Sequence, residues 1–213
     1  MLLADIGNTR VHIYDDNENN NNNNKIIHLY HKEAIERYQD KKIYYITVKS
    51  QLKKSLNRLE SWIDISDKII LKGSYSTMGI DRKALCLSHK TGIFISAGSA
   101  ITVDIMKDGE YQGGFLLLGL TQYIKSYGLI SPALKTNLNQ DINIDKLPKT
   151  TKDGISYGII ASIKMLVEKH QNGKKLYISG GDGEFLSSFF DNAIFDERLI
   201  FQGIKNALRS DIC

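Results

Sequence analysis

The chain has 213 residues, of which 42% are hydrophobic, so it can bury a substantial core as one large domain or as two small lobes. The formal net charge is only +4, and the lysines and arginines are spread along the chain, which disfavours nucleic acid as a partner.

The cysteines and the apolar runs indicate a soluble protein of a reducing cytoplasm. Cys86 and Cys213 have no spacing typical of a disulfide framework or a zinc site. Asp5 comes too early for the apolar region of a signal peptide, and no apolar run approaches the ~18 residues of a membrane span. We therefore expect a cytoplasmic protein without a membrane partner.

The first fourteen residues predict a β-hairpin. Apolar, β-prone residues occupy positions 2–6 and 11–14, on either side of a turn that contains Gly7 and Asn8. The asparagine tract Asn19–Asn24 predicts a loose loop. The next predicted elements are a strand at 25–30, a helix at 32–39, a strand at 42–48, a helix at 50–62 and a strand at 67–71. This order describes a mixed α/β lobe.

Residues 92–106 repeat the pattern of the first hairpin, with a small-residue turn at Gly98-Ser99-Ala100. The repeat predicts two lobes whose hairpin turns form a clamp. The other predicted elements of this half are a helix at 81–89, a strand at 111–118, helices at 120–127 and 153–170, a strand at 174–179, a helix at 184–190, and a strand remnant with a helix over 199–208.

Both predicted turns could bind phosphate. At the first, backbone N–H groups can contact phosphate oxygens while the Asp5 carboxylate holds Mg²⁺ directly or through water. At the second, Ser99 and Thr102 offer hydroxyls; Asp104 either supports the metal or, in the simpler interpretation, faces solvent. The structural alternatives are a surface hairpin with a polar turn and a turn whose hydroxyls bond their own backbone.

Two further patterns have both a functional and a purely structural interpretation. Gly180-Gly181 follows a predicted strand, where the backbone would allow a flat nucleotide base to approach, or would simply turn before a helix. Asp81 and Arg82 lie at a helix start: Asp81 is either an N-cap or a base that accepts a hydroxyl proton, and Arg82 either a solvated charge or an anion ligand.

Taken in this order, the motifs resemble the type III pantothenate kinases, members of the acetate and sugar kinase, Hsp70 and actin superfamily. The matching segments are the first phosphate loop at 5–9, the Gly-x-Asp-Arg signature at 79–82, the second phosphate loop at 98–102 and the segment 113–120, which is similar to the family's Gly-Gly-x-Ile-x-Pro-Gly-Leu. In the last segment, Leu118 replaces the proline of the family pattern.

The resemblance implies roles for individual residues. Asp81 would be the general base, Arg82 would bind the substrate carboxylate, and Thr151 would reach pantothenate across a dimer interface. The implied ATP-binding residues are Asp5, Ile6, Gly7, Asn8, Thr9, Arg10, Val11, His12 and Ser99. The implied substrate-binding residues are Tyr75, Gly79, Ile80, Asp81, Arg82 and Thr151.

The chain departs from the family pattern at two places. Ser96 stands where the family usually has an aspartate that binds a monovalent cation, which puts the potassium or ammonium site in doubt. Tyr75 matches the substrate-contacting tyrosine, at a shorter spacing from the Gly-x-Asp-Arg signature than is usual.

We therefore expect a two-lobed α/β fold of ribonuclease-H-like, actin-like ATPase lobes with mixed sheets and a nucleotide cleft between them. The expected lobes are residues 1–78, with the first phosphate loop, and 79–213, with the second loop, the substrate site and the dimer interface. As the resemblance implies, a homodimer would use ATP and Mg²⁺ to phosphorylate pantothenate at the first step of coenzyme A synthesis.

Two alternatives remain open at this point. One is a kinase of the same superfamily that acts on another small hydroxy acid or sugar. The other is a nucleotide-binding regulator without turnover, which resembles the Bvg accessory factors.

Overall fold

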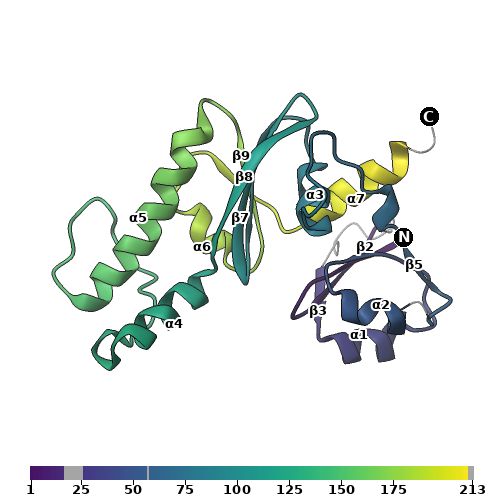
Figure 1. Cartoon of the computed structure of the whole chain (residues 1–213), viewed down its shortest axis with the longest axis horizontal. Helices are drawn as coiled ribbons and strands as arrows, with labels where there is room; N and C mark the ends of the chain where they lie inside the picture. Colours follow the sequence, from purple (N-terminus) through teal and green to yellow (C-terminus); the bar gives the residue numbers. More distant parts are fainter. Residues whose placement is uncertain (17–25, 57, 211–213) are drawn as a thin grey trace. The chain divides into compact units, whose positions relative to one another are not determined.

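Two units, each built on a five-stranded sheet, make up the computed structural model (Figure 1). The structure describes residues 1–16, 26–56 and 58–210, so the asparagine tract lies outside the described residues. The first unit comprises Met1–Lys90, Asp108–Tyr111 and Glu197–Cys213, and the second comprises Thr91–Lys107 and Gln112–Asp196. This division differs from the predicted boundary after residue 78.

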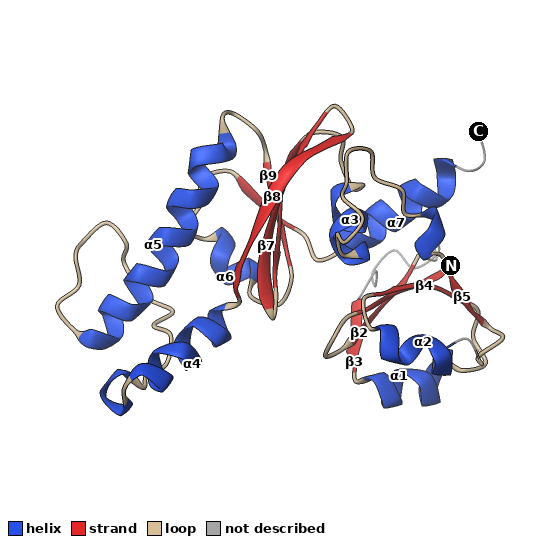
Figure 2. Cartoon of the chain, viewed as in Figure 1, coloured by secondary structure: helices blue, strands red, loops and turns tan. Residues whose placement is uncertain are grey.

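The sheet of the first unit is mixed, as predicted, with the strand order β3-β2-β1-β4-β5 (Figure 2). Its central strand β1 is antiparallel to β2 and parallel to β4. The strands are β1 Leu2–Ile6, β2 Val11–Asp15, β3 Ile26–Leu29, β4 Ile43–Thr47 and β5 Trp62–Asp64.

Helices cover both faces of this sheet because successive side chains of a strand point to opposite faces. Leu3 of β1 packs in one core with residues of the helices α3 and α7, while the adjacent Ala4 packs in another with residues of α1 and α2. The helices are α1 His31–Tyr38, α2 Ser50–Leu56, the 3₁₀ helix η1 Ser66–Lys68, α3 Ile80–Cys86 and α7 Leu199–Ser210.

Helix α7 returns from the end of the chain to complete the first unit. Its Phe201 is buried and stacks on Tyr14 of β2, with ring centroids 5.3 Å apart. Gly203 allows α7 to approach α3 closely, because a Cβ at this position would collide with the carbonyl oxygen of Ala84. The first unit therefore depends on residues from both ends of the chain.

The second unit has a mixed sheet with the order β10-β9-β6-β7-β8. Its strands are β6 Gly92–Ala97, β7 Ala100–Lys107, β8 Glu110–Leu118, β9 Leu176–Ser179 and β10 Ala193–Phe195. Its helices are α4 Leu120–Ile130, the 3₁₀ helix η2 Pro132–Leu134, α5 Thr151–Gln171 and α6 Gly183–Ser187.

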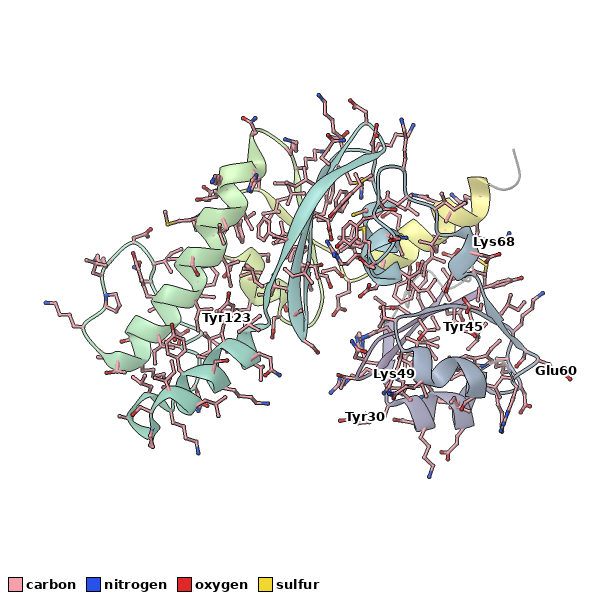
Figure 3. All side chains as sticks on the ribbon, viewed as in Figure 1. Tyr30, Tyr45, Lys49, Glu60, Lys68 and Tyr123 are labelled. Carbon is pink, nitrogen blue, oxygen red and sulfur yellow. The ribbon has the colours of Figure 1, made fainter. Side chains whose placement is uncertain are left out.

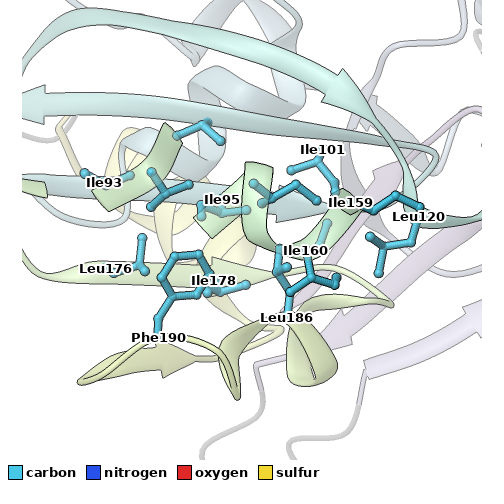
Figure 4. Close-up of a cluster of buried hydrophobic side chains, with 14 of the residues drawn as sticks. Ile93, Ile95, Ile101, Leu120, Ile159, Ile160, Leu176, Ile178, Leu186 and Phe190 are labelled. Atoms are coloured by element: carbon cyan, nitrogen blue, oxygen red, sulfur yellow. The ribbon is translucent and has the colours of Figure 1, made fainter. Parts of the chain in front are cut away.

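The core of the second unit lies between one face of this sheet and the helices α4, α5 and α6. Figure 4 shows its isoleucines from β6, β7 and β9 packed with Leu120 of α4, Ile159 and Ile160 of α5, and Leu186 of α6. Helix α5 begins after Thr150, whose hydroxyl accepts a hydrogen bond from the Asp153 N–H. The helix predicted over residues 153–170 therefore packs one face against this core.

Two predicted elements near residue 65 are wrong. The helix predicted over 50–62 ends at Leu56, because Trp62 instead pairs with Ile43 of β4 and is buried. The strand predicted at 67–71 is absent: β5 occupies that edge of β4, and η1 takes its place together with irregular backbone. Strand β10 was not predicted. Within the described residues, no helix is both long and apolar enough to cross a membrane.

Candidate active site

The first predicted turn joins β1 to β2, and neighbouring elements hold its carbonyl groups. The Gly7 N–H donates to the Arg10 carbonyl at 3.0 Å. The His31 Nε2 atom lies 2.9 Å from the Gly7 carbonyl oxygen, and the Lys49 Nζ atom donates to the Asn8 carbonyl at 3.2 Å. The Arg10 guanidinium lies over the ring of Tyr30, with its central carbon 5.5 Å from the ring centroid. Tyr30 and Lys49 are labelled in Figure 3.

The N–H groups of Asn8 and Thr9 have no acceptor within the described residues. Because the carbonyl groups of the turn are already engaged, these N–H groups are the ones that can bind an anion. Asn8, Thr9 and Arg10 are also exposed. The geometry of the turn therefore suits a phosphate loop.

Asp5 carries the most unusual carboxylate of the first unit. The residue is half-buried, but its Oδ1 atom is enclosed and has no hydrogen-bond partner among the described residues. Burial, together with the negative charge of Asp81, raises the pKa of Asp5 from 3.8 to about 7. A cation near this oxygen would relieve both effects, so the residue fits a role in holding Mg²⁺.

His12 faces Asp5 across the hairpin, since the two are paired in register. Its Nδ1 atom lies 2.6 Å from Nδ1 of His28 on β3. Burial, the proximity of His28 and the charge of Arg10 lower the pKa of His12 to about 4. His12 is therefore neutral at neutral pH and does not offset the charge of Asp5.

In the described ranges, no three His, Cys, Asp or Glu residues converge as a metal-binding group.

Asp81 lies in the first turn of α3, whose N-cap is Gly79, so the structural interpretation of Asp81 as the N-cap is wrong. Its carboxylate accepts a hydrogen bond from the Arg82 N–H at 2.8 Å. Gly79 leaves room for it, because a Cβ there would lie 2.5 Å from the Asp81 Oδ1 atom. Burial raises the pKa of Asp81, against the opposing effect of Arg82. A buried carboxylate with a raised pKa is a stronger base than an ordinary aspartate.

Arg82 is only 6% exposed, so the interpretation of this residue as a solvated charge is also wrong. Its Nη1 atom donates to the Tyr75 hydroxyl at 2.7 Å, and the guanidinium carbon lies 5.8 Å from the centroid of the Tyr75 ring. Its Nη2 atom lies 3.4 Å from the Tyr111 hydroxyl. The structure thus brings Tyr75, Asp81 and Arg82 together and adds Tyr111, which the sequence did not indicate.

The second predicted turn joins β6 to β7 and is supported by the end of β8. The Gly98 N–H donates to the Ala100 carbonyl at 3.1 Å, and the Gly119 N–H donates to the Ser99 carbonyl at 3.3 Å. Gly119 must be a glycine, because a Cβ would overlap the carbonyl oxygens of Gly98 and Ser99. The segment with Leu118 in place of proline therefore still reaches this turn. Ser99 is exposed.

The glycine pair at the end of β9 lies against the end of β6. Gly180 has φ +96° and a backbone so close to Ala97 that no larger residue fits. The Asp182 N–H donates to the Ala97 carbonyl at 3.0 Å, and burial raises the pKa of the Asp182 carboxylate. Two predicted nucleotide-binding segments, at Ser99 and at Gly180, therefore adjoin each other in the second unit.

The opposite face of the second sheet carries polar residues among buried neighbours. Ser96 is paired in register with Thr102, whose Oγ1 atom is buried without a partner in the described part of the chain. Asp104 is fully buried in the middle of β7, so its interpretation as a solvent-facing residue at a strand end is wrong. Thr151, the first residue of α5, is exposed in the second unit.

Comparisons with known proteins identify the family. A family model for the type III pantothenate kinases matches residues 1–172. The type III pantothenate kinase of Campylobacter jejuni is 38% identical over 211 residues, which cover 99% of this chain and 98% of that protein. The chain belongs to the type III pantothenate kinase family. As a member of this family, the chain is a kinase enzyme.

Solved structures confirm the fold class of this kinase. A crystal structure from Campylobacter jejuni, named as a conserved Baf family transcriptional activator, is 36% identical with a TM-score of 0.87 and covers 100% of this chain and 99% of that one. A Sinorhizobium meliloti protein named as a 2-dehydro-3-deoxygalactonokinase is 7% identical with a TM-score of 0.59, covering 99% and 98%. The latter likeness concerns the fold alone, that of the actin-like ATPases and sugar kinases.

Proposed function

We propose that this kinase transfers the γ-phosphoryl group of ATP to the primary hydroxyl of pantothenate, the first step of coenzyme A synthesis. Its family membership supports the reaction and the substrate. At the level of residues, the observation that carries the proposal is that one unit holds two half-buried carboxylates, Asp5 and Asp81, together with the buried Arg82, whose N–H donates to Asp81. Phosphoryl transfer requires charge neutralisation, positioning and one group that orients the nucleophile, and these three residues can supply them.

Residues 5–12 and Ser99 would bind ATP. In the first unit, the phosphates would contact chiefly the N–H groups of Asn8 and Thr9, and in the second unit Ser99 would offer its exposed hydroxyl. The adjoining Gly180-Gly181 backbone would accommodate the base, because it carries no side chains that would exclude a flat ring.

Asp5 would hold Mg²⁺, directly or through water. Its enclosed Oδ1 atom, which lacks a hydrogen bond among the described residues, is the type of hard oxygen ligand that Mg²⁺ prefers. Bound there, the cation would neutralise negative charge on the phosphates.

Asp81 would accept the proton of the attacking hydroxyl, and Arg82 would bind the pantothenate carboxylate. The raised pKa of Asp81 suits a base, and its hydrogen bond to the Arg82 N–H fixes its orientation. The planar guanidinium of Arg82 matches a carboxylate in shape and charge. Tyr75, Gly79 and Ile80 complete the proposed substrate site.

Replacement of Asp81 by asparagine tests the base. We expect Asp81→Asn to lose ~10²–10⁴-fold in kcat, the usual contribution of general base catalysis, while calorimetry shows ATP affinity close to that of the wild type. Asp40→Asn, at an exposed carboxylate, is the matched control and should retain full activity. A folded Asp81→Asn enzyme with turnover within tenfold of the wild type would rule out Asp81 as the base.

We also propose a homodimer in which Thr151 reaches the pantothenate of the neighbouring subunit. The second unit exposes large apolar side chains, including Leu129 at 88%, Ile130 at 73% and Met165 at 71%, and such side chains are favoured at subunit contacts. Activity should fall when dilution produces monomers, as measured by light scattering alongside turnover. Full activity in a monomeric sample would contradict this arrangement.

The residues at the expected monovalent-cation site do not fit a charged site. Ser96 and Thr102 lie opposite each other and offer hydroxyls, so the negative ligand expected from the family is missing. We therefore expect equal rates in sodium, potassium and ammonium. Activation by potassium or ammonium would show that other groups form such a site.

Two alternatives can be separated by one substrate panel with labelled ATP. The name of the Campylobacter jejuni crystal structure favours a regulator, which would show no turnover with any acceptor. A kinase for another acceptor would phosphorylate a different hydroxy acid or sugar; the buried Arg82 favours one that carries a carboxylate. The charge of Asp81, which helps to raise the pKa of Asp5, favours catalysis over the regulator without turnover.

A further inference from the structure

Residues 108–111, which form the turn after β7 and the first two residues of β8, belong to the first unit, although β7 and the rest of β8 belong to the second. Backbone contacts hold this connection: the Gly109 N–H donates to the Lys90 carbonyl at 2.7 Å, and the Tyr111 N–H donates to the Lys72 carbonyl at 2.9 Å. An ion pair of 3.2 Å between Lys72 and Glu110 lies next to them. The backbone of Tyr111 is therefore fixed within the first unit.

Gly73 allows this approach. It has φ +80°, and a Cβ at this position would lie 2.8 Å from the Tyr111 carbonyl oxygen. A side chain at residue 73 would therefore be strained by its own backbone and would also push Tyr111 away. The chain before α3 is thus shaped to receive Tyr111.

The two tyrosines that contact Arg82 have different surroundings. Tyr111 is 8% exposed, whereas Tyr75 is 44% exposed. Their hydroxyls lie near different nitrogens of the guanidinium, Tyr75 near Nη1 and Tyr111 near Nη2. Two contacts on separate nitrogens restrict rotation of the guanidinium plane. Of the two tyrosines, the buried Tyr111 is the more firmly fixed.

We propose that Tyr111 is a positioning residue that sets the plane of the Arg82 guanidinium for the carboxylate of the acceptor. This inference rests on the proposed function. A carboxylate is bound best when its two oxygens meet two parallel N–H groups, so the tilt of the guanidinium determines affinity. Tyr111 acts through Arg82, and its effect should be confined to substrates that carry a carboxylate.

The test compares Tyr111→Phe with the wild type in steady-state kinetics. We expect the KM for pantothenate to rise about 3- to 10-fold, as for the loss of one typical hydrogen bond, while kcat and the KM for ATP stay within about twofold. With the alcohol analogue, in which CH₂OH replaces the carboxylate, the two enzymes should have the same KM. Selectivity for the acid over the alcohol therefore falls in the variant.

Tyr38→Phe is the matched control. Tyr38 is half-buried on α1, and its hydroxyl makes no hydrogen bond within the part of the chain that the structure describes. It should leave both KM values unchanged.

Three outcomes would overturn the inference. The first is an unchanged KM for pantothenate in Tyr111→Phe, and the second is an equal rise for the acid and the alcohol. The third is a rise in the KM for ATP together with a lower Tm, which would indicate a structural role only. A wild-type enzyme that phosphorylates neither the acid nor the alcohol would instead refute the proposed function, so the two failures are distinguishable.

Discussion

Replacing Asp5 by asparagine should stabilise the nucleotide-free enzyme while it removes activity. The Asp5 carboxylate is held where burial and the charge of Asp81 raise its pKa to about 7, from 3.8. Because the charged form is disfavoured in the folded state, folding carries a cost that is small below pH 4 and grows as the pH rises toward 7. Asparagine keeps the shape of the side chain and carries no charge at any of these pH values.

The size of the effect follows from the two pKa values. At ~1.4 kcal/mol per pKa unit, the shift of the Asp5 pKa from 3.8 to about 7 destabilises the folded state by ~4 kcal/mol at pH 8. At pH 5, only the part of the shift between 3.8 and 5 contributes, which is less than ~2 kcal/mol. Asp5 is only half-buried as a residue, so about half of the gap between the two pH values, ~1 kcal/mol, is realistic. For a protein of this length, the Tm gain of Asp5→Asn should be about 2–4 °C larger at pH 8 than at pH 5.

Thermal unfolding by circular dichroism at both pH values, with EDTA and without nucleotide, measures this difference. Added Mg²⁺ and ATP should stabilise the wild type more than Asp5→Asn, because the variant lacks the carboxylate that holds the cation. Asp67→Asn, at an exposed carboxylate, controls for the change of net charge and should show no such dependence on pH. An equal Tm change of Asp5→Asn at the two pH values would refute the reasoning.

Two further substitutions test the packing of each unit. Gly203→Ala should lower the Tm by about 5–10 °C, since overpacking costs ~1–3 kcal/mol or more and the new Cβ meets the Ala84 carbonyl; Gly158→Ala, on an open helix face, should not lower it. Thr102→Val should raise the Tm by about 2–4 °C, because it keeps the shape and removes a buried hydroxyl that has no hydrogen-bond partner among the described residues. A lower Tm would show that this hydroxyl is hydrogen-bonded in solution. Differential scanning calorimetry measures all three variants.

Local sequence patterns predicted both hairpins and most helices, because turn residues and hydrophobic periodicity act over a few positions. Where partners are distant, the patterns failed. Residues 67–71 alternate like a strand, with Ile69 buried and Ile70 77% exposed, but β5 already occupies the edge of β4. Only the pairing of strands could show this.

The residues of the candidate site were likewise predicted where the signal is local and missed where it depends on a distant contact. Asp5, Asp81 and Arg82 were indicated by short motifs whose chemistry is local. Tyr111 was not, because its contact with Arg82 spans 29 positions and depends on the connection between β7 and β8. The sequence did not show that Asp104 is buried. Apolar residues stand before and after it in β7, and this pattern does not reveal which faces of the strand are covered by other elements.

The chain passes between the two units four times, after residues 90, 107, 111 and 196. During synthesis, the second unit can therefore have all its residues before the first unit does, since α7 is translated last. A nascent chain arrested before residue 197 should protect β6 and β9 from proteolysis but leave β1 and β2 open to it. The amino-terminal half of this kinase would then be the last part to become resistant.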